Sequence, residues 1–127
     1  MANLVAVEAN AILAASSGQA AYTAPTTPIT VALVTVIGSA TAAGTEVTGG
    51  SYARQSITFA AAASESISSN VTLTYSSMPA CTVVGVDEYD SATTPVRRWW
   101  GPLTASKTVN AGDTLTIASG SYTKSLS

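Results

Sequence analysis

Residues 29–37 read ITVALVTVI, and this stretch decides the fold class. Its residues are apolar or β-branched at both odd and even positions. Side chains of a strand point alternately to the two faces of a sheet, so a run without a polar face is typical of a central strand covered on both sides. Pro25 and Pro28 lie in a Thr-rich connector (residues 22–28) that forbids helix just before it. The sequence therefore predicts a sheet built around this strand.

Further strand patterns follow at intervals of roughly 8–15 residues. Residues 55–60 alternate Ile57 and Phe59 with polar neighbours, and residues 71–75 do the same. Other candidate strands are a short edge at 46–48 and the segments 81–89, 96–103, 106–109, 114–118 and 122–126, while residues 60–69 are interpreted as a loop. No helix-length amphipathic segment recurs between them. We therefore predict a mainly β fold, an antiparallel β-sandwich of about seven or eight strands.

Residues 1–18 form the one segment of helical character. Asn3 is a plausible N-cap and Gly18 a natural C-cap. Apolar residues recur at spacings of three and four, which places on one face Leu4, Val7, Ala11, Ile12 and Ala15. We predict a single domain over residues 1–127, with a helical arm over 1–18 and a β-sandwich over 29–127. The N-terminus lacks a basic region and Glu8 interrupts its apolar run, so we predict neither an export signal nor a membrane span.

The low fraction of charged residues limits the kinds of function that the sequence favours. Charged residues make up 9% of the chain, whereas about 25% is usual in a soluble domain. A surface of Thr, Ser and Ala costs little to desolvate, which favours a protein covered by neighbours over a monomer with an uncharged surface. The net charge is −2 and the five basic residues form no dense run, so nucleic-acid binding is not expected.

The residue inventory gives little support to catalysis. The chain has no histidine, its single cysteine Cys81 is interpreted as a small core residue, and no Gly-rich phosphate loop is present. We therefore predict no catalytic, cofactor-binding or metal-binding residues. The acidic cluster Asp87, Glu88 and Asp90 is interpreted first as solvated residues where a strand ends. Alternatives are oxygen ligands for Ca²⁺, a glycosidase pair, or cross-strand pairs with Arg97 and Arg98 worth at most about 1 kcal/mol each.

Two adjacent tryptophans follow those arginines. Neighbours on a strand point to opposite faces, so Trp99 and Trp100 cannot line one stacking platform. We expect one in the core and the other at a protein interface, where Trp and Arg are enriched. With the apolar residues of the arm, the interface candidates are Leu4, Val7, Ile12, Arg97, Arg98, Trp99 and Trp100.

Several stretches resemble a known group of proteins. They are AYTAP at 21–25, GTEVTGGSYARQ at 44–55, WGPLT at 100–104 and KTVNAGDT at 107–114. Together with the arm and the central strand they resemble small structural proteins of tailed bacteriophages, described as head decoration or tail-fibre-like proteins. The chain departs from this pattern at residues 76–90, where SSMP and the acidic cluster replace an expected tryptophan-containing segment. The resemblance implies a non-enzymatic β-sandwich built into a virion.

Three hypotheses follow from the residues and the resemblance. The first is a capsid decoration protein on the virion head, assembled in the host cytoplasm, with the major capsid protein and copies of itself, as a trimer, for partners. Many weak contacts repeated by symmetry would then give tight attachment. The second is a tail-fibre or tail-tip module that contacts the host surface, through glycan at Trp99 or Trp100. The third is a cell-wall hydrolase acting through Asp87, Glu88 or Asp90. No nucleic acid, membrane or cofactor is expected in any of them.

Overall fold

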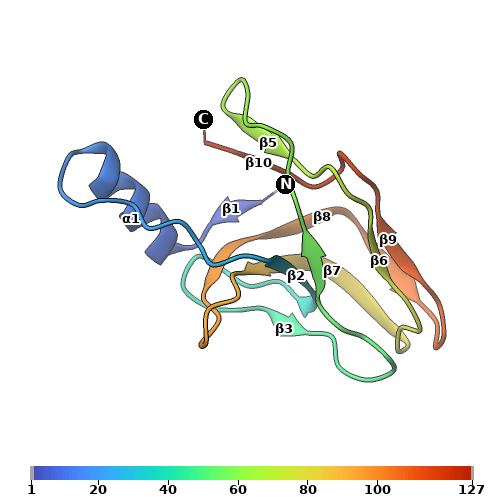
Figure 1. Cartoon of the computed structure of the whole chain (residues 1–127). Helices are drawn as coiled ribbons and strands as arrows, with labels where there is room; N and C mark the ends of the chain where they lie inside the picture. The colour runs from blue at the N-terminus through green and yellow to red at the C-terminus, as the bar shows by residue number, and fades with distance from the viewer. Residues whose placement is uncertain (1, 127) are drawn as a thin grey trace.

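The computed structural model describes residues 2–126 as layered antiparallel strands with one helix standing out to the side (Figure 1). The predicted mainly β fold with one short N-terminal helix is confirmed. The elements in chain order are β1 (Asn3–Leu4), α1 (Ala6–Ser16), β2 (Ile29–Val36), β3 (Thr45–Glu46), β4 (Gln55–Ile57), β5 (Ser66–Ser68), β6 (Leu73–Tyr75), β7 (Cys81–Tyr89), β8 (Arg97–Val109), β9 (Leu115–Ile117) and β10 (Thr123–Ser125).

The larger sheet has the strand order β1-β8-β7-β2-β3, and β4 also pairs with β2. Strand β2 has β7 along one edge and β3 and β4 along the other, so it is central as predicted. Its residues 31–34 are at most 1% exposed, although they point alternately to the two faces. The absence of a polar face in residues 29–37 therefore reflects cover on both sides.

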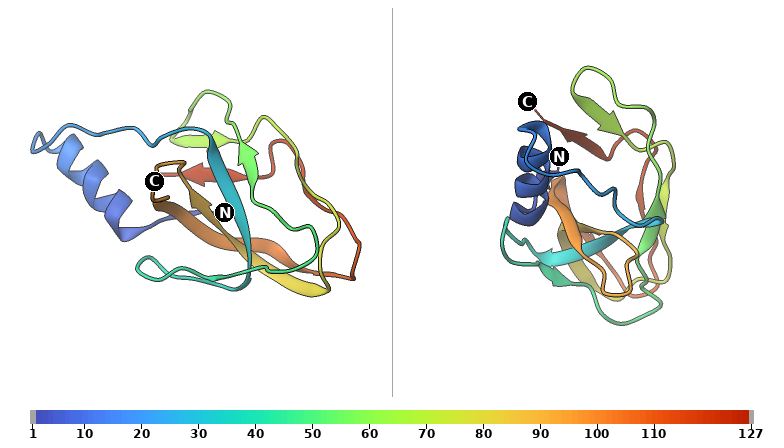
Figure 2. Two further views of the ribbon diagram at one scale, coloured as in Figure 1. Left: turned by 60° about the horizontal axis from the view of Figure 1, so that its bottom comes forward. Right: turned by 60° about the vertical axis from the view of Figure 1, so that its left-hand side comes forward.

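Two small sheets, β6 with β9 and β5 with β10, form the second layer (Figure 2). The core lies between the layers, where residues of the large sheet meet those of the small ones. Its members include Val31, Leu33 and Val86 on one side and Leu73, Tyr75, Leu115, Ile117 and Tyr122 on the other. This layout is that of a β-sandwich.

The structure differs from the predicted strands at two points. Strand β5 lies inside the segment predicted as a loop. It pairs with β10 through backbone hydrogen bonds, and its serine-rich sequence lacks the apolar alternation from which a strand is predicted. Strand β8 is continuous over the two segments predicted as 96–103 and 106–109. Its pairing with β7 shifts register between Val83 and Gly85, so β8 bulges there and bends.

The N-terminal arm differs from its prediction in register. Asn3 is not the N-cap but pairs with Trp100 in β1, and α1 begins after Val5. The helix ends as predicted, with Gly18 at φ +75° just beyond it. The face that packs on the sheet carries Glu8, which is 2% exposed, whereas Val7 is 55% exposed. Of the expected apolar stripe, Val7 is thus turned to solvent, whereas Leu4, Ala11, Ile12 and Ala15 are half-buried.

Candidate functional site

The acidic cluster is not solvated, contrary to the leading interpretation of the sequence. Asp87, Glu88 and Asp90 are 1–2% exposed. Strand β7 lies between β2 and β8, and the cations that neutralise its carboxylates come from β8 and from β10. The alternative of pairing with Arg97 and Arg98 is confirmed: Asp87 pairs with Arg97 at 3.1 Å and Asp90 with Arg98 at 2.9 Å.

Asp87 holds a loop against the outer face of the large sheet. Its carboxylate accepts hydrogen bonds from Arg97 (3.1 Å) and from the Gly44 N–H (2.9 Å). The same arginine donates to the Ser39 carbonyl at 2.7 Å. The loop thus covers the face away from the core, where a Cβ on Gly85 would lie 2.4 Å from the Ile37 side chain. The same Cβ would lie 2.6 Å from the Gly101 carbonyl oxygen of β8, a backbone atom, so residue 85 must be glycine for this strand pairing.

Arg98 joins the N-terminal helix to the sheet. Its guanidinium donates two hydrogen bonds to Asp90, at 2.9 and 3.2 Å, and one to Glu8 at 2.6 Å. Burial alone would raise the pKa of Asp90, but hydrogen bonds from the Val96 N–H and from Arg98 outweigh it and lower that pKa. The Tyr22 hydroxyl also donates to Glu8. Burial, together with this bond, raises the pKa of Tyr22 to about 12.

Glu88 faces the core side of the sheet and pairs with Lys124 of β10 at 3.0 Å. The Lys124 ammonium also lies over two aromatic rings, 4.0 Å from the centre of Phe59 and 4.9 Å from that of Trp99. Burial raises the pKa of Glu88, and Lys124 offsets this only in part. This pair links the two layers across the core.

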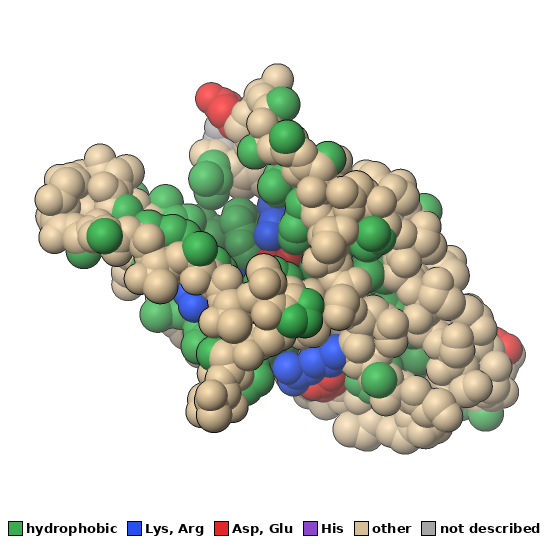
Figure 3. All heavy atoms as spheres, in the orientation of Figure 1, with side chains coloured by type: hydrophobic (Ala, Val, Ile, Leu, Met, Phe, Trp, Pro, Cys, Tyr) green, Lys and Arg blue, Asp and Glu red, His purple; other side chains and the backbone are tan. Residues whose placement is uncertain are grey.

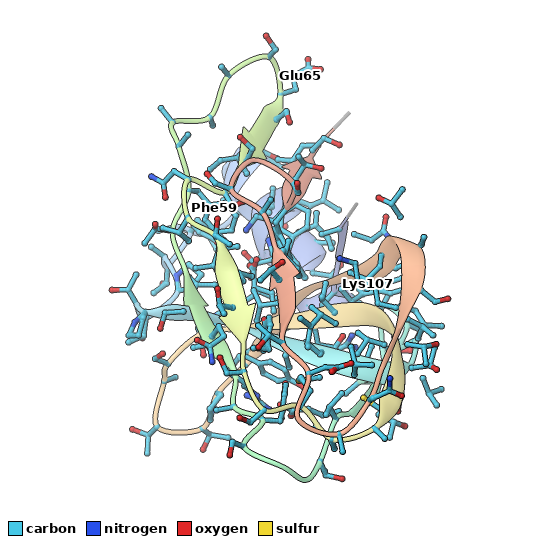
Figure 4. All side chains as sticks on the ribbon, turned by 90° about the vertical axis from the view of Figure 1, so that its right-hand side faces the viewer. Phe59, Glu65 and Lys107 are labelled. Carbon is cyan, nitrogen blue, oxygen red and sulfur yellow. The ribbon has the colours of Figure 1, made fainter. Side chains whose placement is uncertain are left out.

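These pairs leave the surface almost without free charge. The chain has five basic and seven acidic side chains. Within residues 2–126, the five ion pairs engage nine of these twelve, including the half-exposed pair Arg54–Glu46. The three that remain are Glu65, Lys107 and Asp113. Figure 4 shows Glu65 at the far tip of the β5 segment and Lys107 on β8.

The adjacent tryptophans point to opposite faces, as predicted. Trp99 pairs with Leu4 in β1, packs against the core and lies beside Lys124. Trp100 lies on the other face, and its indole N–H donates to the Leu4 carbonyl at 3.3 Å. Both rings are half-buried. Of the helical candidates, Ile12 is half-buried and Val7 exposed. The structure thus gathers Leu4, Trp99, Trp100 and Arg98 at the base of the arm.

An apolar recess lies between β8 and the β5–β10 pair. It has a volume of about 270 Å³, and its apolar lining comes from Ala62, Ile67, Trp99 and Leu126. Figure 3 shows hydrophobic side chains gathered in the hollow between α1 and the protruding β5 segment. No pattern in the sequence predicts this recess, because the residues that line it come from three separate parts of the chain.

Within residues 2–126 no group of three or more Cys, Asp or Glu side chains is arranged to hold a metal ion. The one free cysteine, Cys81, packs against the core as expected, and burial raises the pKa of its thiol. No helix of the described chain is both long and apolar enough to cross a membrane.

Comparison with known proteins identifies the family. No curated protein matches the chain. The family model described as "Podophage GP4 fiber I protein gp80" matches residues 3–125, which is nearly the whole chain. The resemblance to phage structural proteins noted in the sequence is thereby confirmed: the chain belongs to the podophage GP4 fiber I protein gp80 family, a family of bacteriophage virion structural proteins.

Proposed function

We propose that this chain is a module of a phage tail fibre, which takes part in the fibre's contact with the host surface and carries out no chemistry. The observation that carries the proposal is the nearly charge-free surface: nine of the twelve charged side chains are engaged in ion pairs within residues 2–126. A surface of hydroxyls and small apolar side chains is suited to contact with protein or glycan, because few charges have to be desolvated. The family's description as a fibre protein favours the tail over the head.

The same ion pairs argue for a structural role of the acidic cluster. A general acid or base must reach its substrate, whereas Asp87, Glu88 and Asp90 are buried and each bonds a cationic side chain. We expect the purified protein to release no sugars from host cell-wall glycan. Hydrolysis that disappears on replacing the three carboxylates by amides, in a variant that still folds, would contradict this role.

The location is tested by labelling purified virions with antibodies to this chain and by measuring its copy number by quantitative mass spectrometry. A tail-fibre module is labelled at the tail and present in a small multiple of the tail's symmetry. Hundreds of copies on the head would refute the proposal and support the decoration hypothesis. In that case added protein should also protect decoration-free heads against heat.

Host contact is tested separately by competition. Purified protein should reduce phage adsorption to host cells in proportion to its concentration. A matched protein without surface charge, such as an unrelated Thr-rich β-sandwich, serves as the control. If antibodies label the tail but the purified protein does not reduce adsorption, the chain is a fibre component that does not contact the host.

A further inference from the structure

The pair of Glu88 and Lys124 differs from the other ion pairs of the chain in the chemistry that its two groups can undergo. Within residues 2–126 the other four ion pairs are made by arginines, and this one is made by a lysine. An arginine guanidinium stays protonated and is not a nucleophile. A lysine amine, in contrast, can condense with a carboxyl group to form an amide.

The two groups are in contact and shielded from water. The Lys124 nitrogen lies 3.2 and 3.0 Å from the two carboxylate oxygens of Glu88. The carboxyl carbon between these oxygens is therefore close to the separation of roughly 3–3.5 Å from which a bond can form. The Glu88 side chain is 2% exposed and that of Lys124 is 10% exposed. The rings of Phe59 and Trp99 cover the nitrogen on the side away from the carboxylate.

The hydroxyl of Tyr122 provides a third group at this place. Tyr122 is completely buried and lies beside the Glu88 carboxylate. Within residues 2–126 its hydroxyl is the one buried side-chain oxygen that makes no hydrogen bond of normal geometry. Buried polar groups are nearly always hydrogen-bonded, so this exception requires an explanation. Attack on a carboxyl carbon places negative charge on its oxygen, and a hydroxyl held beside that oxygen can donate to it.

We propose that the side chains of Glu88 and Lys124 join through an amide bond, and that the Tyr122 hydroxyl assists this step as a hydrogen-bond donor. The ammonium first passes a proton to the carboxylate, which gives an amine and a carboxylic acid. The amine nitrogen then forms a bond to the carboxyl carbon. The carbon–oxygen bond to the hydroxyl breaks, and the hydroxyl leaves as water with a proton from the nitrogen. The step balances without a further reactant.

Burial and contact both favour the product. Keeping two charges away from water is costly even when they are paired, and the amide carries neither charge. Burial also raises the pKa of Glu88, which favours the carboxylic acid that the step consumes. Two groups held in the right orientation react as if each were present at roughly 10⁵–10⁸ M.

The bond would form once in each chain and would consume the chain's own side chains. It is therefore a self-modification and not the turnover of a substrate, which the proposed function excludes. It would fasten β10 to β7 wherever the chain lies in the virion. The ion pair is the precursor of the amide, and the pH dependence of stability that the ion pair gives belongs to chains that have not lost water.

Intact-mass spectrometry of the folded, purified chain tests the proposal. The amide form should be lighter than the mass calculated from the sequence by one water molecule, and tandem spectrometry of a digest should find residues 88 and 124 joined. Lys124→Arg keeps the positive charge and should have its full calculated mass. Lys107→Arg, which changes the chain's other lysine, is the matched control and should still lose water.

Tyr122→Phe separates the chemistry from the structure. It removes a buried hydroxyl without a hydrogen bond and keeps the ring, so the fold should persist, as circular dichroism would verify. Amide formation after refolding should slow by about 100-fold. An unchanged rate would overturn the role of Tyr122. A wild type that keeps its full mass on prolonged incubation overturns the whole proposal, as does a loss of water that persists in Lys124→Arg. Neither result bears on the place of the chain in the virion, which antibody labelling decides.

Discussion

Replacing Arg98 by Met tests whether the buried ion pairs hold the arm to the sandwich. Arg98 neutralises Glu8 and Asp90, which are both 2% exposed, at 2.6 and 2.9 Å. Methionine keeps the apolar stem but leaves two buried carboxylates without a cation. Removing one partner of a buried pair costs about 3–5 kcal/mol. At roughly 4 °C per kcal/mol for a chain of this size, the melting temperature should fall by about 12–20 °C.

The pH dependence separates this mechanism from simple loss of packing. In the wild type the pKa of Asp90 is lowered, so its contribution to stability is present above its ordinary pKa and is lost as the pH falls through the folded value. Without Arg98 the buried Asp90 carboxylate loses the cation that lowers its pKa, so protonation relieves its burial instead. The difference in unfolding free energy between wild type and Arg98→Met, measured by urea denaturation, should therefore shrink from pH 7 to about pH 4.5.

Arg54→Met is the matched control, because the Arg54–Glu46 pair is about one-third exposed. It should cost only about 1 kcal/mol. Adding Glu8→Gln and Asp90→Asn to Arg98→Met should recover part of the loss, since no unpaired charge remains. A loss below about 1 kcal/mol for Arg98→Met, or one independent of pH, would refute the reasoning.

Three further substitutions probe the sheet and its charges. Gly85→Ala should destabilise the chain by about 1–3 kcal/mol in urea denaturation, because its Cβ would lie 2.6 Å from the Gly101 carbonyl oxygen, a backbone atom of β8 that cannot move aside without disturbing the sheet; an unchanged midpoint would mean that β7 and β8 are not so closely spaced at this point. Tyr52→Phe removes a hydroxyl that accepts the Leu33 N–H and should cost about 1–3 kcal/mol by thermal denaturation. The raised pKa of Glu88 means that its favourable contribution is complete below its ordinary value near 4.5 and is lost as the pH rises. Wild type should therefore gain stability relative to Glu88→Gln on acidification, and a constant difference would contradict the raised pKa.

The strands were predictable where local pattern and burial agree. Residues 29–37 are apolar at both parities and form the central strand β2, and residues 81–89 form β7 with the predicted bounds. The opposite orientation of Trp99 and Trp100 also follows from the two-residue period of a strand. Strand β5 could not be predicted in this way. Its pairing with β10 depends on backbone hydrogen bonds, which require no particular pattern of side chains in this serine-rich segment.

Within the site, only the ion pairs between residues close together in the sequence could be predicted. The ion pairs of Asp87 with Arg97 and of Asp90 with Arg98 lie across one hairpin. Pairing with these two arginines was one of the alternatives predicted from the sequence. The pair of Glu8 with Arg98 joins residues 90 positions apart, and that of Glu88 with Lys124 joins residues 36 apart. No local signal encodes either partner, so the acidic cluster resembled an exposed strand end.

The class of the molecule could be predicted before its structure was known: a β-sandwich with a short helical arm, few charges and few of the residues that catalysis requires. The two-residue period of a strand and the amino-acid composition are local properties, so they can be recognised without knowledge of the fold. The folded structure was needed to show where the charges lie, which face of α1 is covered, and that Trp99 borders an apolar recess. The physical reason is that burial and ion pairing depend on segments brought together from distant parts of the chain, and the environment of a side chain is set by those neighbours and not by its own sequence position.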